Sequence, residues 1–126
     1  MGKRILVADD DPVLLDVLSV ALIPDGYSVQ TCTSAEAATV AVQTQHWDLI
    51  LLDLIGRAPH EEAYGMVERI CELAGGSPIL LMPTSAIAAE WAQANPRLAG
   101  VLPKPFGLED LLRQVGEAVD LQPQAA

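Results

Sequence analysis

The sequence predicts an α/β fold, a three-layer sandwich in which helices cover both faces of a five-stranded parallel sheet. Five short, continuous aliphatic runs recur along the chain, and such runs are typical of strands buried on both faces. A segment with apolar residues at helical spacing follows each run. This alternation indicates right-handed crossovers between parallel strands. A length of 126 residues fits one domain with a core of its own.

The predicted strands end where acidic or turn-forming residues interrupt the apolar runs. The first run meets three consecutive aspartates after Ala8, and the third run closes at Asp53. The second run alternates apolar and polar side chains, which is typical of a strand with one less buried face. The strands are expected at residues 4–8, 27–32, 48–53, 77–82 and 100–102.

The helix starts are predicted from capping residues. Asp11 followed by Pro12 indicates an N-cap and a first helical position, because the cap oxygen accepts free amides and proline has no amide to lose. Ser34 caps an alanine-rich segment in the same way. The helices are expected from Pro12 to the turn at residues 24–26 and at residues 35–45, 65–74, 87–94 and 108–119, with a polar loop at residues 54–64. We expect residues 1–121 to form the domain and the polar residues 122–126 a flexible tail.

The composition excludes several classes of protein. With 7 basic and 17 acidic residues the net charge is −10, so nucleic-acid backbones and anionic membranes would repel the chain. No apolar run approaches the roughly 20 residues of a membrane-spanning helix. The two cysteines, Cys32 and Cys71, form no CxxC pair, and we expect buried thiols in a reducing cytoplasm. The sequence thus predicts a cytoplasmic protein without a direct nucleic-acid or membrane partner.

Chemistry-bearing residues follow four of the five predicted strands. Asp9 and Asp10 follow the first, Asp53 closes the third, Thr84 follows the fourth and Lys104 the fifth. If these strands are neighbours, the side chains converge at the strand ends, where such folds bind ligands. Crowded carboxylates repel one another and favour a cation among them, and oxygen ligands suit Mg²⁺. With the lysine and the hydroxyl, the set could stabilise a phosphoryl group that one aspartate has taken up.

The chain resembles the response regulator receiver domains of two-component signalling over nearly its whole length. The order and spacing of four motifs carry the resemblance: Ile5-Leu6-Val7-Ala8-Asp9-Asp10-Asp11-Pro12, Leu51-Leu52-Asp53-Leu54, Pro78-Ile79-Leu80-Leu81 and Leu102-Pro103-Lys104-Pro105-Phe106. The resemblance implies a flavodoxin-like fold with strand order 2-1-3-4-5. It also implies that the chain is a phosphorylation-dependent switch and not an enzyme, although it assists its own phosphoryl transfer and dephosphorylation.

The resemblance assigns roles to the acidic residues. Asp53 would be the phosphoacceptor. Asp9, Asp10 and Asp53 would bind Mg²⁺, with the backbone carbonyl of Ile55 as a further ligand. Ile55 also occupies a position that helps to set how fast the phosphoryl group is hydrolysed. Because isoleucine cannot orient an attacking water, we expect slow loss of the phosphoryl group.

The resemblance also assigns the residues on the other side of the site. Lys104 would pair with Asp53 or its phosphoryl group, and the Lys104-Pro105 peptide bond would be cis, as is usual in the family. Thr84 would be the hydroxyl that follows the phosphoryl group when the domain switches. Pro83 unsettles the alignment by one position, so Ser85 is the alternative to Thr84.

The sequence departs from the family pattern in two further places. Residues 55–64 match poorly, and the glycine expected in this loop comes late, at Gly65. A longer loop that folds over the site is therefore expected. The aromatic residue whose rotation accompanies switching would fall at Val101, which has no ring. A readout through a tyrosine on the fifth strand is therefore ruled out.

The expected phosphodonor is a histidine kinase or a phosphotransfer protein. The expected output is a downstream protein that binds the face made by residues 87–94, 100–102 and 108–119, and homodimer formation is left open. The sequence does not distinguish a stand-alone receiver from one domain of a longer protein.

Two other functions remain open from the sequence. One is a receiver-like interaction module that takes no phosphoryl group, which the unusual loop, Pro83 and Val101 favour. The presence of all three acids and of Lys104 argues against it. The other is a metal-dependent phosphatase of the haloacid dehalogenase type. Such enzymes carry a second acid two residues after the nucleophile, where this chain has Ile55.

Overall fold

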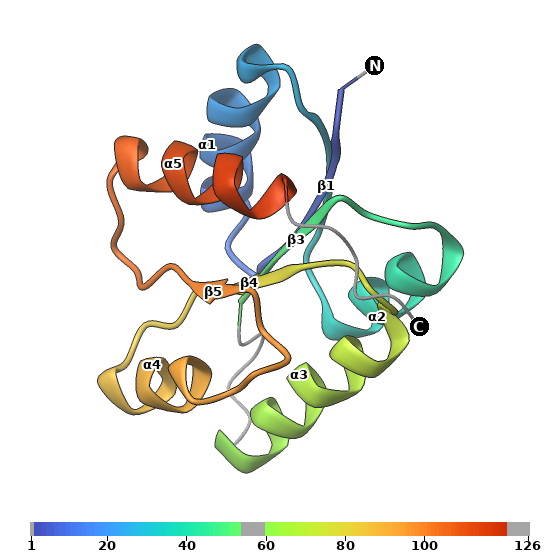
Figure 1. Ribbon diagram of the computed structural model, residues 1–126, viewed down its shortest axis with the longest axis vertical. Helices are drawn as coiled ribbons and strands as arrows, with labels where there is room; N and C mark the ends of the chain where they lie inside the picture. Colours follow the sequence, from blue (N-terminus) through green and yellow to red (C-terminus); the bar gives the residue numbers. More distant parts are fainter. Residues whose placement is uncertain (1, 54–59, 121–126) are drawn as a thin grey trace.

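The computed structural model describes residues 2–53 and 60–120. Its centre is a parallel five-stranded sheet with the order β2-β1-β3-β4-β5. In Figure 1, α1 and α5 lie on one side of the sheet, and α2, α3 and α4 lie on the other. The predicted fold class and strand order are therefore confirmed.

The elements alternate strand and helix along the chain. The strands are β1 (Arg4–Ala8), β2 (Ser28–Cys32), β3 (Leu49–Leu52), β4 (Ile79–Leu81) and β5 (Gly100–Val101). The helices are α1 (Pro12–Leu22), the 3-10 turn η1 (Ile23–Asp25), α2 (Ala35–Thr44), α3 (His60–Leu73), α4 (Ala86–Gln93) and α5 (Leu108–Val119). Each predicted strand and helix is present, and the strands are at most a few residues shorter than expected.

The register of the sheet brings the chemistry-bearing strand ends to one edge. Ala8 at the end of β1 pairs with Leu52 at the end of β3. Leu52 pairs in turn with Leu81, and Leu81 pairs with Val101. Because all strands run parallel, the residues that follow these four positions leave the sheet at the same edge.

The two faces of the sheet pack into two apolar clusters. On one face, Val7 and Leu51 pack with Leu18 from α1 and Val115 from α5. On the other face, Ile50 packs with side chains from α2 and α3 and with the buried ring of Trp47. The central strands β1 and β3 are buried on both faces, which explains their continuous apolar sequences.

Side chains cap the helices as the sequence predicts. Asp11 accepts hydrogen bonds from the amides of Val13 and Leu14, at 3.0 and 3.4 Å, and Pro12 begins the helix. Ser34 caps α2 in the same way. At the other end of α1, Gly26 has a φ of 98°. Only glycine adopts this conformation without strain, and it lets the chain turn into β2.

The start of the third helix was predicted wrongly. A polar loop was expected at residues 54–64 and a helix from Gly65, but α3 already runs from His60. Glu61 and Glu62 lie in its first turn, where negative charge is favourable. Gly65 lies inside the helix, and a Cβ atom at this position would meet no heavy atom within 4 Å outside the neighbouring helix backbone. No close approach therefore requires a glycine here. The expectation that a longer loop folds over the site falls on residues 54–59, which lie outside the described residues.

Within the described part of the chain, no helix has the length and apolar character that a bilayer span requires.

Candidate functional site

Backbone hydrogen bonds at the sheet edge position the candidate site residues. The amide of Asp53 donates to the carbonyl of Ala8 at 2.9 Å, and the amide of Asp9 donates to the carbonyl of Cys32 at 3.1 Å. The amide of Lys104 donates to the carbonyl of Pro83 at 2.8 Å, and the Lys104-Pro105 peptide bond is cis, as predicted. These hydrogen bonds fix the backbone of Asp9, Asp53 and Lys104 at the strand ends.

Three carboxylates converge at this edge. Asp9, Asp10 and Asp53 each offer an oxygen, and these oxygens lie within 4.8 Å of one another. Asp9 is fully buried and Asp53 is 8% exposed, whereas Asp10 is exposed. Negative charges held this close, two of them away from water, repel one another strongly unless a cation lies among them.

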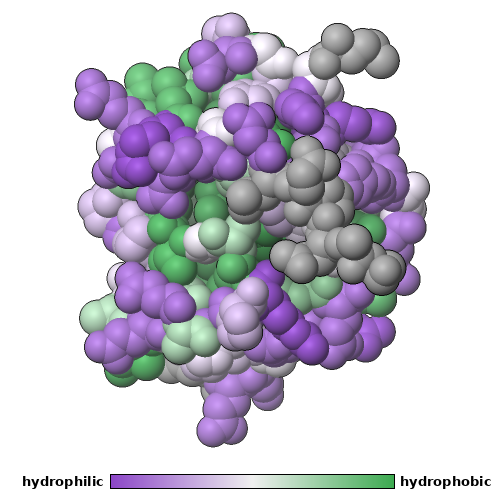
Figure 2. Space-filling model, in the orientation of Figure 1, coloured by the Kyte–Doolittle hydropathy of each residue, from purple (hydrophilic) through white to green (hydrophobic). Residues whose placement is uncertain are grey.

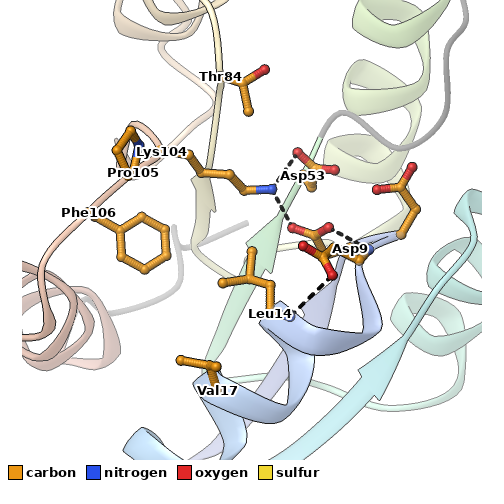
Figure 3. Close-up of a pocket in the computed structure, with 10 residues that line it drawn as sticks. Asp9, Leu14, Val17, Asp53, Thr84, Lys104, Pro105 and Phe106 are labelled. Atoms are coloured by element: carbon orange, nitrogen blue, oxygen red, sulfur yellow. Dashed lines mark hydrogen bonds and ion pairs between the residues drawn. The ribbon is translucent and has the colours of Figure 1, made fainter.

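Lys104 supplies one positive charge to the cluster. Its Nζ donates to Oδ2 of Asp9 at 2.6 Å and to Oδ1 of Asp53 at 3.1 Å (Figure 3). The other oxygen of Asp9 accepts a hydrogen bond from the amide of Asp11 at 2.9 Å. One ammonium group opposite three carboxylates leaves the cluster negatively charged, so the site favours a further cation.

The pKa values of Asp53 and Lys104 reflect this balance. Burial raises the pKa of Asp53 above its ordinary value, and the charge of Lys104 opposes that effect, while Asp9 and Asp10 raise the pKa further. Burial alone would lower the pKa of Lys104, but its hydrogen bond to Asp9 and the charge of Asp53 raise it overall. Lys104 therefore stays protonated at neutral pH, and a divalent cation would favour the ionised form of Asp53.

A cavity of about 750 Å³ opens beside the three acids. Lys104 and Thr84 also line the cavity, and Leu14, Val17 and Phe106 give it an apolar wall (Figure 3). The apolar wall was not predicted from the sequence. Its signal lay in the spacing, because Leu14 and Val17 are one helical turn apart directly after the acidic triplet.

The two candidate hydroxyl residues have different environments. Thr84 is exposed and lines the cavity, and in Figure 3 its hydroxyl oxygen points away from Lys104 and Asp53. Ser85 is the N-cap of α4, and its hydroxyl accepts a hydrogen bond from the amide of Ala88 at 3.1 Å. Ile55, the remaining predicted ligand, lies outside the described residues.

The donor set fits Mg²⁺. All three candidate ligands are carboxylates, and hard oxygen donors are the ligands that Mg²⁺ prefers. One of the three carboxylates is exposed, and the cavity beside them has space for water. Mg²⁺ commonly keeps several water ligands, so three protein ligands are sufficient.

A parallel sheet with this strand order has the flavodoxin-like fold, here with an acidic cluster at its strand ends, and comparison with known proteins identifies the family. The chain belongs to the response regulator receiver domain family, whose sequence pattern matches residues 5–116. It is therefore a signalling domain of two-component systems and not a conventional enzyme.

One similar protein of known role is a transcriptional regulator. The DNA-binding transcriptional regulator NtrC of Rhizobium meliloti (strain 1021) is 32% identical over 119 residues. These residues make up 94% of this chain and 24% of that protein, so the chain spans about a quarter of its relative's length.

Solved structures share the fold. A CheY-like receiver domain protein from Methanospirillum hungatei JF-1 is 25% identical with a TM-score of 0.80, and the match covers 95% of both chains. The receiver domain of the sensor histidine kinase PA1611 from Pseudomonas aeruginosa PAO1 is also 25% identical, with a TM-score of 0.77. That match covers 96% of this chain and 100% of the other, whose active-site cleft holds a coordinated magnesium ion.

Proposed function

We propose that Asp53 accepts a phosphoryl group from a histidine kinase or a phosphotransfer protein in a Mg²⁺-dependent reaction. The modified domain then changes its binding to a downstream protein. One observation carries the proposal: the Asp53 carboxylate lies beside the carboxylates of Asp9 and Asp10 and 3.1 Å from the ammonium group of Lys104. Each group in this arrangement has a separate task in phosphoryl transfer.

Asp53 is the nucleophile of the proposed reaction. One of its carboxylate oxygens attacks phosphorus, and a new P–O bond forms. The bond between phosphorus and the donor breaks, and its electron pair leaves with the imidazole of a phosphohistidine or with the acetate of acetyl phosphate. The product is an acyl phosphate on Asp53. The attack needs the ionised carboxylate, which Lys104 stabilises by its charge.

Asp9, Asp10 and Asp53 are the proposed Mg²⁺ ligands, together with the backbone carbonyl of Ile55. Bound there, Mg²⁺ would offset the negative charge of the phosphoryl oxygens as they approach the carboxylate. The position of Asp9 supports this assignment, because the amide of Asp11 and the ammonium of Lys104 hold both of its oxygens in place.

Lys104 and Thr84 are the proposed phosphoryl-binding residues. Lys104 already contacts Asp53, and its ammonium group would pair with a phosphoryl oxygen after transfer. Thr84 would donate its hydroxyl hydrogen to the same group once it turns toward the site. The capping role of Ser85 supports the choice of Thr84 as the switch hydroxyl, because the Ser85 oxygen is engaged with α4.

The proposed output surface is the face formed by α4, β5 and α5. Figure 2 shows an apolar region over β5, beside the more hydrophilic surface of α5. A small cavity of about 170 Å³ lies there, lined by Leu80, Gly100 and Gln114 among others. An exposed apolar strip with polar borders suits a protein partner. The net charge of −10 supports a protein partner over direct contact with nucleic acid, and the free thiols support a cytoplasmic setting.

The test is the intact mass of the chain after incubation with acetyl phosphate, with and without Mg²⁺. We expect a mass increase of one phosphoryl group that needs Mg²⁺ and disappears in Asp53→Ala. If Mg²⁺ binds but no adduct forms with acetyl phosphate or with a phosphorylated kinase domain, phosphoacceptor function is refuted. If the chain neither binds Mg²⁺ nor forms an adduct, a phosphorylation-independent interaction module is favoured instead. Val101, which stands where the family has an aromatic residue, is consistent with such a module. Hydrolysis of a generic phosphomonoester would favour a phosphatase.

A further inference from the structure

The fourth helix, α4, has an unusually small apolar anchor. The side chains it buries are Ala88 and Ala92, each a single methyl group. Its largest aliphatic side chain, Ile87, is 67% exposed. Because the free energy of burial scales with the apolar area removed from water, α4 gains little from its contact with the sheet. By comparison, α5 buries Leu111 and Val115.

Trp91 provides the large apolar contact that α4 otherwise lacks. Its ring stacks on the ring of Tyr64 in α3, with the centroids 4.2 Å apart and the planes 9° from parallel. Beyond the area buried, aromatic pairs of this kind change an equilibrium constant by about 2- to 12-fold. The stack is therefore a main contributor to the position of α4.

The position of α4 is linked to the candidate switch hydroxyl. Thr84 directly precedes Ser85, the residue that caps α4. The hydroxyl of Thr84 points away from Asp53 (Figure 3), so it must move with its backbone or rotate to reach a phosphoryl group there. A helix from Ala86 to Gln93 is only about two turns long, and in this proposal it moves as one unit. A displacement at its first residue therefore reaches Trp91 in its last turn.

We propose that the Tyr64–Trp91 stack is a latch that holds α4, and with it Thr84, in the arrangement of the unphosphorylated domain. The inference rests on the proposed function of Asp53. Phosphorylation draws Thr84 toward the site, displaces α4 and opens the stack. Because β5 carries Val101 instead of an aromatic residue, the stack provides an aromatic coupling at a different place, between α3 and α4.

Removal of either ring should release the latch. A ligand that favours one of two states binds more readily when the competing state is destabilised. We expect Tyr64→Leu and Trp91→Leu each to accept a phosphoryl group from acetyl phosphate about 2- to 10-fold faster than the unmodified chain. The double variant should be no faster than either single variant, because both changes remove the same contact.

Conservative variants separate the latch from a general loss of packing. Trp91→Phe and Tyr64→Phe keep two stacked rings and should react at the original rate. Ile87→Ala, an exposed truncation on the same helix, should also leave the rate unchanged. In the unmodified chain, the fluorescence of Trp91 should change on phosphorylation, and this change should be missing in Trp91→Phe, which retains Trp47. This fluorescence measurement does not depend on the folding of the leucine variants.

The outcomes distinguish the latch from the function on which it rests. If the unmodified chain accepts the phosphoryl group but the leucine variants react at the same rate and Trp91 fluorescence stays constant, the latch is refuted and the phosphoacceptor role stands. If the unmodified chain takes up no phosphoryl group from any donor, the proposed function fails and the latch fails with it. Leucine variants that only melt at lower temperature, with an unchanged rate, would reduce the stack to a packing contact.

Discussion

The ion pairs of Lys104 give a quantitative prediction for the substitution Lys104→Met. Methionine keeps most of the side chain's length and apolar stem but removes the charge that faces Asp9 and Asp53. At 2.6 and 3.1 Å, with an effective dielectric constant of about 20, the two attractions amount to roughly 6 and 5 kcal/mol before any desolvation cost. The cost of removing the lysine charge from water offsets much of this attraction, because burial disfavours the charged form of Lys104.

The net cost follows from the carboxylate that is left behind. Asp9 has no exposed surface and would keep only the amide of Asp11 as a partner among the contacts described for it. Removal of one member of a buried ion pair costs about 3–5 kcal/mol. Because the Lys104 side chain is 18% exposed, we expect the lower end, about 3 kcal/mol. For a domain of this size, that lowers the melting temperature by about 10 °C.

Thermal unfolding followed by circular dichroism in Mg²⁺-free buffer measures this effect. Lys3→Met is the matched control, because it removes the same charge from an exposed position. Saturating Mg²⁺ should recover more stability in Lys104→Met than in the unmodified chain, since it replaces the missing positive charge. The electrostatic explanation of the site is refuted if Lys104→Met and Lys3→Met melt at the same temperature. It is also refuted if Mg²⁺ raises the melting temperatures of these two variants equally.

Three further predictions concern single residues. The raised pKa of Asp53 means that the folded chain holds the carboxyl proton more tightly than the unfolded chain does. Ionisation of Asp53 therefore costs stability as the pH rises through and above the ordinary pKa of 3.8. Without Mg²⁺, Asp53→Asn should unfold at a higher urea concentration than the unmodified chain at pH 7, and the difference should vanish at pH 3. Burial, followed by the charge of Glu68, raises the pKa of Cys71 to about 11, from an ordinary value of 9.0. Cys71 should therefore react with iodoacetamide at pH 7 roughly a hundredfold more slowly than a free thiol, and a rate equal to that of glutathione would contradict this. Asp11→Ala removes the α1 cap and should cost about 1 kcal/mol in urea unfolding; no loss would show that the cap is replaceable.

Much of the fold was predictable because local signals agree with the tertiary structure. The continuous apolar runs of β1 and β3 lie in the sheet centre, and the Asp11 and Ser34 caps begin helices where expected. The strand order could not be predicted in this way, because no local pattern determines which strands are neighbours. It came from the resemblance to receiver domains, and the register of the sheet confirms it.

The parts that were missed depend on contacts between distant residues. The third helix was expected to begin at Gly65, but α3 begins at His60, because packing of its apolar residues outweighs the unfavourable effect of a glycine inside the helix. Thr84 and Ser85 were alternatives from the sequence, because the hydrogen bond that Ser85 accepts from the amide of Ala88 is visible only in the structure. The Tyr64–Trp91 stack joins two helices far apart in sequence, and nothing near either residue indicates it.

The proposed function requires that the acyl phosphate forms on Asp53, and identification of the modified residue is a direct test. Borohydride reduces an aspartyl phosphate to homoserine, so peptide mapping of the chain after incubation with Mg²⁺ and acetyl phosphate locates the modified residue. We expect homoserine at position 53 and at no other aspartate. Homoserine at Asp9 or Asp10, or a phosphoryl group retained on a histidine, would contradict it.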